Sequence, residues 1–467
     1  ADFDTILKDL ERMRPHALSS EVETLLASGQ EVFGATGNVY DMLTDVDMSL
    51  GKVKGEDGKM VELTHARYGS MLESPNRAVR KAAYERMMKA YAAYGSTFAA
   101  TYAGNVKGDV FLARAHGYQS AREAALYPDD IPVSVYDNLL KAVHDALPVL
   151  HAYCGMRKEA FNIPTVHMYD LYAPMTKDFQ MKLTFDEAYE LLLEAVAPLG
   201  KDYQDVVRSA KDGGWIDVYE TKGKTTGAYS NGSAYGVHPY VLLNFRPELD
   251  GLLTLAHEMG HAMHSYYSNQ AQPFVKSDYT IFVAEVASTC NEVLTINALR
   301  KKFAGNQAAQ QALIGRLLEG FRTTVFRQTM FAEFEKIINE KTANNEVLTS
   351  DALNQIYADL NKFYYGEDVI VDDEISMEWA RIPHFYMNFY VYQYATGFSA
   401  AMALSQKLLH GTQADIEAYL SFLKGGCTKS PVELLRMAGV DMASPKPVED
   451  AIELFDSLID EFESIMK

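Results

Sequence analysis

Two histidines and a glutamate in this sequence have the spacing of a hydrolytic metal site. His257 and His261 lie four residues apart in 252–264, a stretch rich in leucine, alanine and methionine that we expect to be helical. Positions i and i+4 of a helix lie on one face, so both imidazoles can reach one tetrahedral ion. Glu258 follows about 100° further round the helix. A carboxylate there suits a general base beside a catalytic water, so the motif predicts a zinc site.

A catalytic zinc ion needs a third protein ligand and one open position. Residues 265–268 lack the histidine that metzincins carry after the motif, which excludes that subclass. The carboxylates that follow are Asp278, Glu285 and Glu292. Glu285 lies in the apolar stretch 282–287, where a carboxylate is costly unless it is paired or binds metal. We therefore predict that Glu285 is the third ligand, with an ion-paired structural glutamate as the alternative.

Two residues near these ligands are expected to support the site without binding the ion. Glu292 lies seven residues after Glu285, close to the same face of a second expected helix, and can hold a ligand imidazole in place. His264 lies three residues after His261 and would fill the position that a catalytic zinc ion keeps open. We assign His264 a packing or supporting role.

A second group of candidate catalytic residues lies in the aromatic-rich stretch 379–397. Phenols and an imidazole near zinc could donate hydrogen bonds to an oxyanion as it forms. We name His384, Tyr390 and Tyr394 as candidates, because the two tyrosines are four residues apart and share a helix face. Tyr392 would point elsewhere and is kept as a candidate substrate contact. The alternative is an aromatic stripe that belongs to the core.

The elements that must position these residues are mostly helices. Apolar residues recur every three or four positions in five long stretches, which are 134–153, 185–196, 308–338, 352–365 and 448–466. Thr184 and Glu187 form a capping box at the start of the second stretch. Residues 50–63 contain a turn signal between short apolar segments and predict a small hairpin.

Residues 211–245 break the helical pattern with glycines and tyrosines, and they end in a predicted strand over 240–245. We expect this strand at the edge of the active-site cleft, where it would bind the main chain of a substrate as an added strand. His238, Tyr240 and Leu242 are the candidate substrate contacts. The alternative is a buried core strand, since residues 241–243 are all apolar.

Composition narrows the class of protein. The 467 residues are 48% hydrophobic and 23% charged, which is typical of a soluble globular protein. A net charge of −20 argues against nucleic acid or an anionic membrane as a partner. Three scattered cysteines fit neither a disulfide framework nor a metal-binding pair, so we expect a reducing, cytoplasmic location.

Several blocks together carry a resemblance to a known family. The segments 238–244, 254–261, 282–288, 326–335 and 381–386, in this order, resemble oligoendopeptidase F, a branch of the thimet oligopeptidase group of zinc peptidases. The resemblance runs through nearly the whole chain, up to the glycine pair 425–426.

The resemblance implies a mainly α fold, with a two-lobed helical body, a deep central channel, and a small β-sheet beside the zinc site. It implies one Zn²⁺ per chain held by His257, His261 and Glu285, a base at Glu258, and substrate or oxyanion contacts at His384 and nearby tyrosines. We expect a single metallopeptidase unit over 1–467 that lacks the N-terminal helical region usual in the family. Residues 1–200 would form a mostly helical lobe and residues 201–467 the catalytic lobe.

The function that these observations favour is zinc-dependent hydrolysis of internal bonds in oligopeptides. A zinc carboxypeptidase or dipeptidyl-carboxypeptidase on the same frame is the first alternative. A helical binding protein with a structural zinc is the second. It is disfavoured because Glu258 is present and because a structural site would close the metal with four protein ligands.

Overall fold

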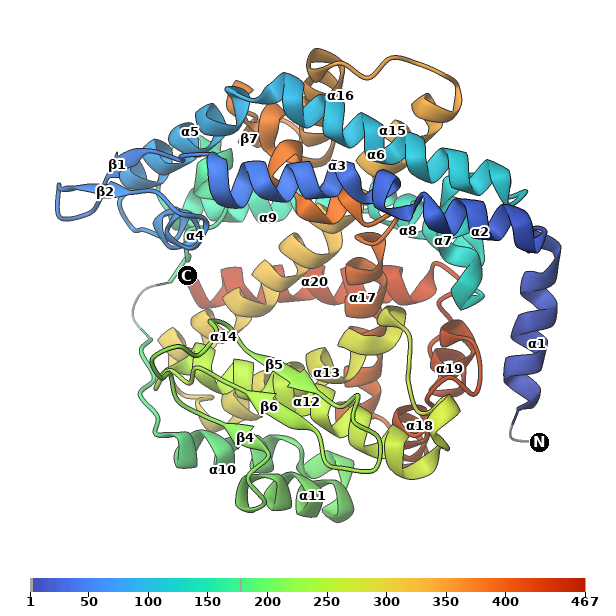
Figure 1. Ribbon diagram of the computed structural model, residues 1–467. Coiled ribbons are helices and arrows are strands. Elements are labelled where there is room, and N and C mark those ends of the chain that lie inside the picture. Colours follow the sequence, from blue (N-terminus) through green and yellow to red (C-terminus); the bar gives the residue numbers. More distant parts are fainter. Residues whose placement is uncertain (1–2, 177–178, 467) are drawn as a thin grey trace.

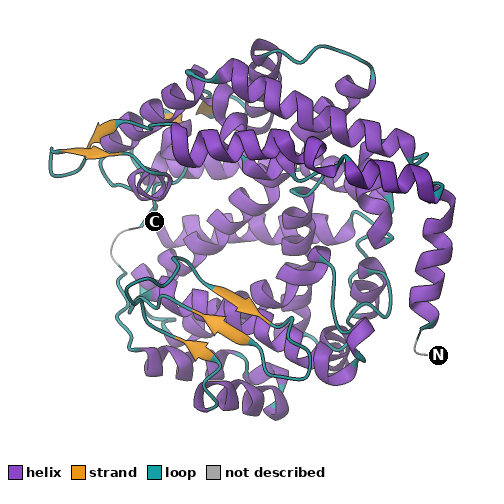
Figure 2. Ribbon diagram, in the orientation of Figure 1, coloured by secondary structure: helices purple, strands orange, loops and turns teal. Residues whose placement is uncertain are grey.

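The computed structural model of the protein describes residues 3–176 and 179–466, which fold into helices arranged in two tiers (Figure 1). Helices make up most of both tiers, and strands are few and short (Figure 2). The expected fold class, a two-lobed helical body with a small sheet beside the metal motif, is confirmed. The expected division of the chain at residue 200 stays a prediction.

The upper tier in Figure 1 contains most of the first third of the chain, coloured blue to green, with α15 and α16 added from later in the sequence, whereas the first helix runs down beside the lower tier. Helix α6 packs against α3 on one side and α15 on the other. The early elements are α1 (Asp4–Met13), α2 (Ser20–Ser28), α3 (Gln30–Met42), β1 (Lys52–Lys54), β2 (Met60–Glu62), α4 (His65–Leu72), α5 (Arg77–Ala92), α6 (Gly95–Ala115), α7 (Ala121–Leu126), α8 (Val133–Asp145), α9 (Leu147–Ala160) and β3 (Val166–His167).

The lower tier contains the metal motif and the three-stranded sheet. Helices α12 and α13 pack against each other, and α10 covers both. The elements are α10 (Phe185–Ala195), α11 (Lys201–Asp212), β4 (Ile216–Asp217), β5 (Tyr229–Asn231), β6 (Tyr240–Leu242), α12 (Leu249–Ala271), α13 (Ile281–Lys302), α18 (Gln413–Leu423) and α19 (Pro431–Met437).

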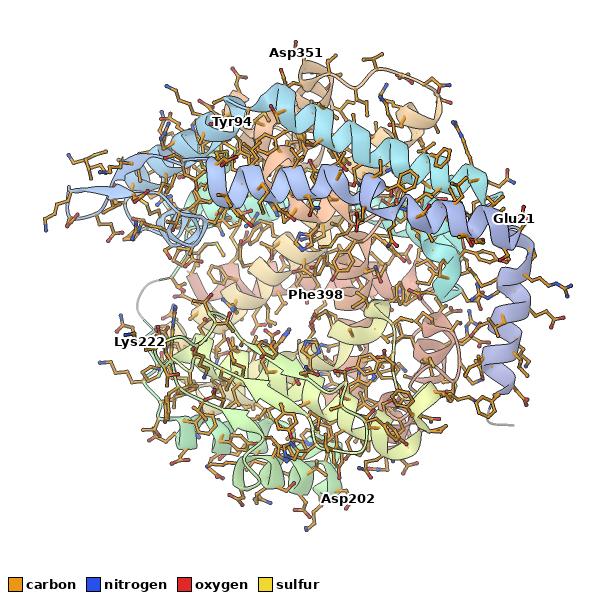
Figure 3. The ribbon with its side chains drawn as sticks, in the orientation of Figure 1. Glu21, Tyr94, Asp202, Lys222, Asp351 and Phe398 are labelled. Carbon is orange, nitrogen blue, oxygen red and sulfur yellow. The ribbon has the colours of Figure 1, made fainter. Side chains whose placement is uncertain are left out.

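The remaining elements either belong to the upper tier, as α15 and α16 do, or join the two tiers. Helix α17 packs against α13 of the lower tier and α15 of the upper tier, and α20 packs against α14, α17 and α9. Figure 3 shows side chains between the tiers, with Phe398 of α17 labelled there. These elements are α14 (Gln307–Gly320), α15 (Arg327–Ala343), α16 (Ser350–Tyr365), β7 (Val369–Ile370), α17 (Tyr392–His410) and α20 (Lys446–Met466).

Local sequence signals predicted several elements correctly, but they did not reveal that two of the predicted helices are interrupted. The capping box of Thr184 and Glu187 begins α10 as predicted, and the hairpin in 50–63 is β1 paired with β2. The stretch 134–153 is two helices, α8 and α9, because Pro148 lies in the first turn of α9. The stretch 308–338 is likewise divided, since a π-helical turn at Phe321–Phe326 separates α14 from α15.

The three-stranded sheet corrects one expectation. Its order is β4-β6-β5, so the predicted strand is the central one. The amides of Val241 and Leu243 donate to carbonyls of Trp215 and Asp217 on one side, at 2.8 Å each, and β5 pairs antiparallel on the other. Because the backbone of β6 is already paired on both sides, the prediction that it receives a substrate strand is wrong. The alternative of a buried core strand is met only in part, since Val241 and Leu243 are buried whereas Tyr240 is half-exposed.

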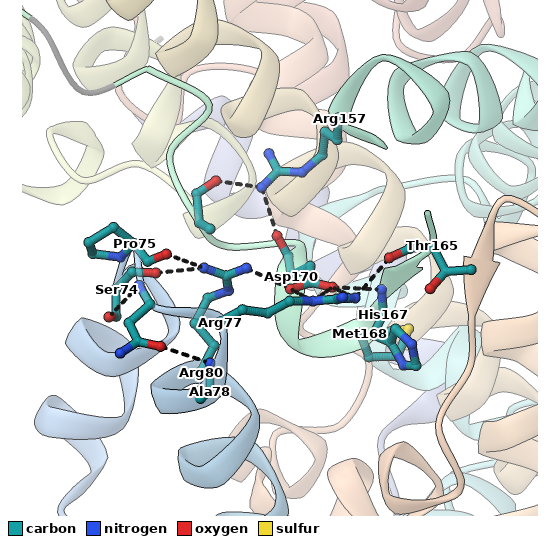
Figure 4. A network of polar contacts seen from close by, with 12 residues as sticks. Ser74, Pro75, Arg77, Ala78, Arg80, Arg157, Thr165, His167, Met168 and Asp170 are labelled. Atoms are coloured by element: carbon teal, nitrogen blue, oxygen red, sulfur yellow. Dashed lines mark hydrogen bonds and ion pairs between the residues drawn. The ribbon is translucent and has the colours of Figure 1, made fainter. Parts of the chain in front are cut away.

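A buried ionic network ties α5 to α9 in the upper tier (Figure 4). The fully buried carboxylate of Asp170 accepts hydrogen bonds from Arg77 and Arg80, at 2.7 Å each. Burial acts to raise the pKa of Asp170, but these bonds and one from the His167 amide outweigh it and lower the pKa. Arg157 of α9 donates to the backbone carbonyl of Asp170 at 3.0 Å. A buried charge with several partners is costly to disturb, so this network fixes the two helices.

Within residues 3–176 and 179–466, none of the helices combines the length and the apolarity that crossing a bilayer requires.

Candidate metal centre

Helices α12 and α13 touch at a glycine inside the metal motif. A Cβ atom added to Gly260 would lie 2.5 Å from the Cα of Ser288 and 2.6 Å from the carbonyl oxygen of Ala287. Real side chains do not approach a backbone so closely, so only glycine permits this contact. Gly260 lies beside His261, and Glu285 lies one turn before Ser288. The contact therefore sets the distance between the histidines of one helix and the glutamate of the other.

Three side chains from these helices meet at one point. The Nε2 atoms of His257 and His261 are 3.1 Å apart, and each lies 3.3 Å from the Oε2 atom of Glu285. The ligand atoms of the three residues all lie within 4.8 Å of one another, and no other such group of three occurs among the described residues. Two imidazoles and a carboxylate are nitrogen and oxygen donors that zinc accepts, so the group fits the predicted ion.

Two neighbours on α13 orient these donors. The Nδ1 atom of His257 lies 2.7 Å from Oε1 of Glu292, and the hydroxyl of Ser288 donates to Oε2 of Glu285 at 2.9 Å. A hydrogen bond at Nδ1 leaves Nε2 as the atom that faces the other two donors. Glu292 therefore lies beside the first imidazole, and its supporting role stays a prediction.

The charges at this point favour a cation. Burial acts to lower the pKa of His257, but hydrogen bonds to Glu285 and Glu292 outweigh it and raise the pKa to about 10. Burial acts in the opposite sense on Glu285, yet its bonds to His257 and His261 lower the pKa of its carboxyl. Two carboxylates therefore stabilise positive charge between the imidazoles.

Glu258 lies next in sequence to His257 and is 6% exposed. Burial raises the pKa of its carboxyl, although the nearby His257 and His261 act to lower it. A carboxyl group with a raised pKa exchanges protons more readily near neutral pH.

The donor group opens into a cavity of about 490 Å³ between α13, α14 and α17. His257, Glu285 and Glu292 line one side, and Tyr394 and Phe398 of α17 line another. The rest of the lining is mixed: Val293, Ile296, Leu317 and Met402 are apolar, and Arg316, Glu319, Thr323 and Thr324 are polar or charged.

Three of the predicted catalytic residues form one cluster beside this cavity. The rings of His384 and Tyr390 are stacked, with centroids 5.8 Å apart, and the ring of Tyr394 meets both edge-on at 5.9 and 5.4 Å. The hydroxyl of Tyr394 lies 3.4 Å from Nε2 of His384. Burial lowers the pKa of His384 and raises that of Tyr394, so both groups are neutral at neutral pH and can donate a hydrogen bond.

The other named residues lie apart from the cavity. Tyr392 is buried, and its ring packs 5.1 Å from Tyr136. His238 stacks on Trp215 at 5.1 Å, beside the half-exposed Tyr240. Leu242 lies within β6. Substrate contact by these residues stays a prediction.

His264 is buried and has a packing environment. Its ring stacks on Tyr279, with centroids 3.8 Å apart and an angle of 7° between the ring planes. Burial lowers the pKa of His264 to about 3, and the nearby His261 adds to the effect. The side chain is therefore a neutral ring within the core, as a packing role requires.

Sequence reasoning missed two features of the site. One is the helix contact at Gly260, for which the small residues Ala287 and Ser288 were a usable signal. The other is the strand order, which places β4 and β5 at the two edges of the sheet and β5 at the edge to which we assign the substrate below. Strand order depends on contacts between distant segments, so no local pattern could have identified that edge.

Comparison with known proteins finds matches that cover nearly the whole chain. The model of Peptidase family M3 matches residues 70–454, and the Oligopeptidase F model matches residues 1–49. Oligopeptidase PepF of Bacillus subtilis is 46% identical over 99% of this chain and 69% of its own length. An oligoendopeptidase F homolog of Lactococcus lactis is 42% identical over 100% and 77%. The crystal structure of oligoendopeptidase-F from Enterococcus faecium has a TM-score of 0.82 and 37% identity, over 99% of this chain and 78% of that one.

The helix contact predicts that Gly260→Ala destabilises the protein. The added methyl group must push α12 and α13 apart, and overpacking of this kind costs about 1–3 kcal/mol. Gly155→Ala in α9 is the matched control, because a Cβ atom there meets nothing within 4 Å. This control should be neutral or stabilising by up to about 1 kcal/mol. Urea unfolding of both variants measures the difference, and equal stabilities would contradict the assigned contact.

Proposed function

The chain belongs to peptidase family M3, and we propose that it is a zinc-dependent oligoendopeptidase that cleaves internal bonds of short peptides. The observation that carries the proposal is the convergence of His257, His261 and Glu285 at a cavity, with Glu258 beside the first of them. Membership of a peptidase family argues against the alternative of a non-catalytic binding protein. An exopeptidase on the same frame remains the competing function.

We assign one zinc ion to His257, His261 and Glu285, with Glu292 orienting the first imidazole. Three protein donors on one side and a cavity on the other match a catalytic site, which keeps a position open, rather than a closed structural one. When bound, the ion supplies Lewis acidity, which makes water a nucleophile near neutral pH and polarises a carbonyl group.

Glu258 acts as the general base and then as the acid. It accepts a proton from the attacking water and donates it to the nitrogen of the leaving amine. The raised pKa of its buried carboxyl suits both halves of this exchange, because a group that must gain and lose a proton works best near the ambient pH.

Tyr394 donates to the oxygen of the scissile carbonyl as negative charge builds there. It is the member of the aromatic cluster that lines the same cavity as His257 and Glu285. His384 and Tyr390 hold its ring from two sides, so its hydroxyl is oriented before substrate binds. Such preorganised donors stabilise a transition state more than a ground state.

The main chain of the substrate binds along the free edge of β5. The amides of Val241 in β6 and of Leu243, which follows it, donate to the β4 side, so the antiparallel alternation directs the backbone groups of Tyr240 and Leu242 toward β5. On β5, Asn231 and Tyr229 are their partners, which leaves the amide and carbonyl of Ser230 facing outward. Binding through backbone groups tolerates varied side chains, as a general oligopeptidase requires.

We also propose that the enzyme acts in the cytoplasm. Cys154 and Cys290 are buried as free thiols, which suits a reducing compartment. The proposed substrates are short peptides. The cavity of about 490 Å³ beside the donors has room for a few residues of a peptide but not for a folded chain.

A peptide blocked at both ends separates the proposed function from its alternative. An endopeptidase should cleave an N-acetylated, C-amidated peptide internally, because it needs no free terminus. A carboxypeptidase or dipeptidyl-carboxypeptidase should leave the blocked peptide intact and shorten the same peptide with a free carboxylate. Mass spectrometry of the products, with and without a chelator, decides between them. Exclusive removal of C-terminal residues would refute the endopeptidase assignment.

Glu258→Gln and His261→Ala should both lose peptidase activity, but for different reasons. Glu258→Gln keeps the shape but removes the base, so it should retain zinc and lose about 10²–10⁴-fold in turnover. His261→Ala removes a ligand and should lose the metal itself. Elemental analysis and peptidase assays measure the two effects side by side. Near-stoichiometric zinc in His261→Ala, or normal turnover in Glu258→Gln, would overturn the corresponding role.

Tyr394→Phe should lower kcat and kcat/KM together by about 10²-fold, with little change in KM, because the hydrogen bond is made mainly in the transition state. Tyr84→Phe is the control, since this buried hydroxyl lies in α5 and has no hydrogen-bond partner among the described residues. Steady-state kinetics measure both. If Tyr394→Phe keeps its kcat and loses only thermal stability, the aromatic cluster belongs to the core.

A further inference from the structure

Glu335 of α15 is a buried carboxyl group that the proposed chemistry does not use. It is 1% exposed, and its Oε1 atom accepts a hydrogen bond of 2.6 Å from the backbone amide of Phe389, 54 residues later. Its Oε2 atom has no hydrogen-bond partner among the described residues. Burying an acid without a cation beside it costs folding free energy, which indicates that the group has a structural or functional role.

The amide that Glu335 holds belongs to a residue in an unusual conformation. Phe389 has a φ of +54°, in the left-handed region. Three other non-glycine residues of the described chain have a positive φ, and they are Asp130, Asn162 and Asn345. Asp and Asn tolerate this region, whereas a bulky aromatic residue does not and must be held there by its surroundings. Phe389 is 2% exposed, with its ring 5.7 Å from Tyr136.

The turn at Phe389 determines where the next residue points. Tyr390 follows directly, and its amide donates to the carbonyl of Met387 at 2.9 Å, which closes the turn before α17. Its ring stacks on His384 and meets Tyr394 edge-on. If Phe389 relaxed to a negative φ, the chain direction at Tyr390 would change and this stack would be lost.

We propose that Glu335 is a positioning residue: its carboxyl holds the Phe389 amide in the left-handed turn and thereby fixes Tyr390, His384 and Tyr394 at the cavity. The catalytic consequence rests on the proposed function, whereas the contact and the turn do not. The bond reaches from a helix of the upper tier to the loop that precedes α17, so the scaffold of one tier sets the aromatic cluster at the cavity.

A neutral group is sufficient for this task. Burial raises the pKa of the Glu335 carboxyl well above its ordinary value, and Asp109 adds to the effect. Burial also raises the pKa of Asp109, to about 7. The hydrogen bond from the Phe389 amide acts to lower the pKa of Glu335, but the effect of burial is larger, so the pKa is raised. Since the neutral acid accepts through one oxygen, glutamine should replace it and leucine should not.

The wild-type protein provides the first test. Hydrogen exchange followed by mass spectrometry, with overlapping peptides that end at residues 388 and 389, isolates the Phe389 amide. That amide should exchange slowly although it lies in a loop, because its proton is bonded to a buried acceptor. Exchange as fast as in an open loop would overturn the proposal, whether or not the protein is a peptidase.

Two variants of Glu335 and one control complete the test. Glu335→Leu should speed exchange at Phe389 and lower kcat by about tenfold or more with KM within about twofold, since misplaced groups lose rate rather than binding. Glu335→Gln should restore both values to near wild type. Thr329→Val is the control, because it removes another buried polar group of α15 that has no partner among the described residues. It should change neither value.

The outcomes separate the two claims. Slow exchange that is lost in Glu335→Leu and kept in Glu335→Gln, without a change in kcat, would support the contact and refute its link to catalysis. Equal loss of kcat in Glu335→Gln and Glu335→Leu would overturn the positioning role. If Glu335→Leu does not fold, the rates of hydrogen exchange at the Phe389 amide in wild type and in Glu335→Gln still test the proposed contact. Absence of peptidase activity in wild type would refute the proposed function. The hydrogen-exchange result would then still test whether Glu335 holds the Phe389 amide.

Discussion

The close contact of α12 and α13 is the constraint on which the rest of the site depends. Gly260 lies among the metal-binding positions of one helix and meets the backbone of Ala287 and Ser288 on the other. Without that approach, Glu285 could not lie 3.3 Å from both imidazoles. Gly260 therefore has a structural role within a motif whose histidines and glutamate are proposed to bind metal and catalyse. The close contact that it permits explains why one pair of helices can supply every proposed ligand.

The opposite side of the cavity depends on the other tier. Arg157 bonds to Asp170 and also lies 3.4 Å from Glu319, which lines the cavity from α14. Glu335 reaches from α15 to the turn before α17, whose Tyr394 faces the donors. Buried polar contacts of this kind add little net stability but fix geometry. The two sides of the cavity are thus held by different means, one by helix packing and the other by buried acids.

The parts of this structure that sequence could predict are those that local rules determine. The spacing of His257 and His261, and the position of Glu292, follow from helix periodicity, and the capping box at Thr184 begins a helix for reasons confined to one turn. The place of β6 at the centre of its sheet could not be predicted, because strand order depends on contacts between distant segments. The turn at Phe389 is similar, since a residue 54 positions away holds it.

The central claim is that three protein side chains hold one zinc ion and leave its remaining position free. X-ray absorption at the zinc edge of the purified protein tests it most directly, because the outer shells report imidazole and the first shell distinguishes sulfur from nitrogen and oxygen. The account predicts one zinc per chain with two imidazoles and otherwise oxygen donors. A sulfur donor, or a third imidazole that would bring His264 or His384 into the first shell, would contradict it.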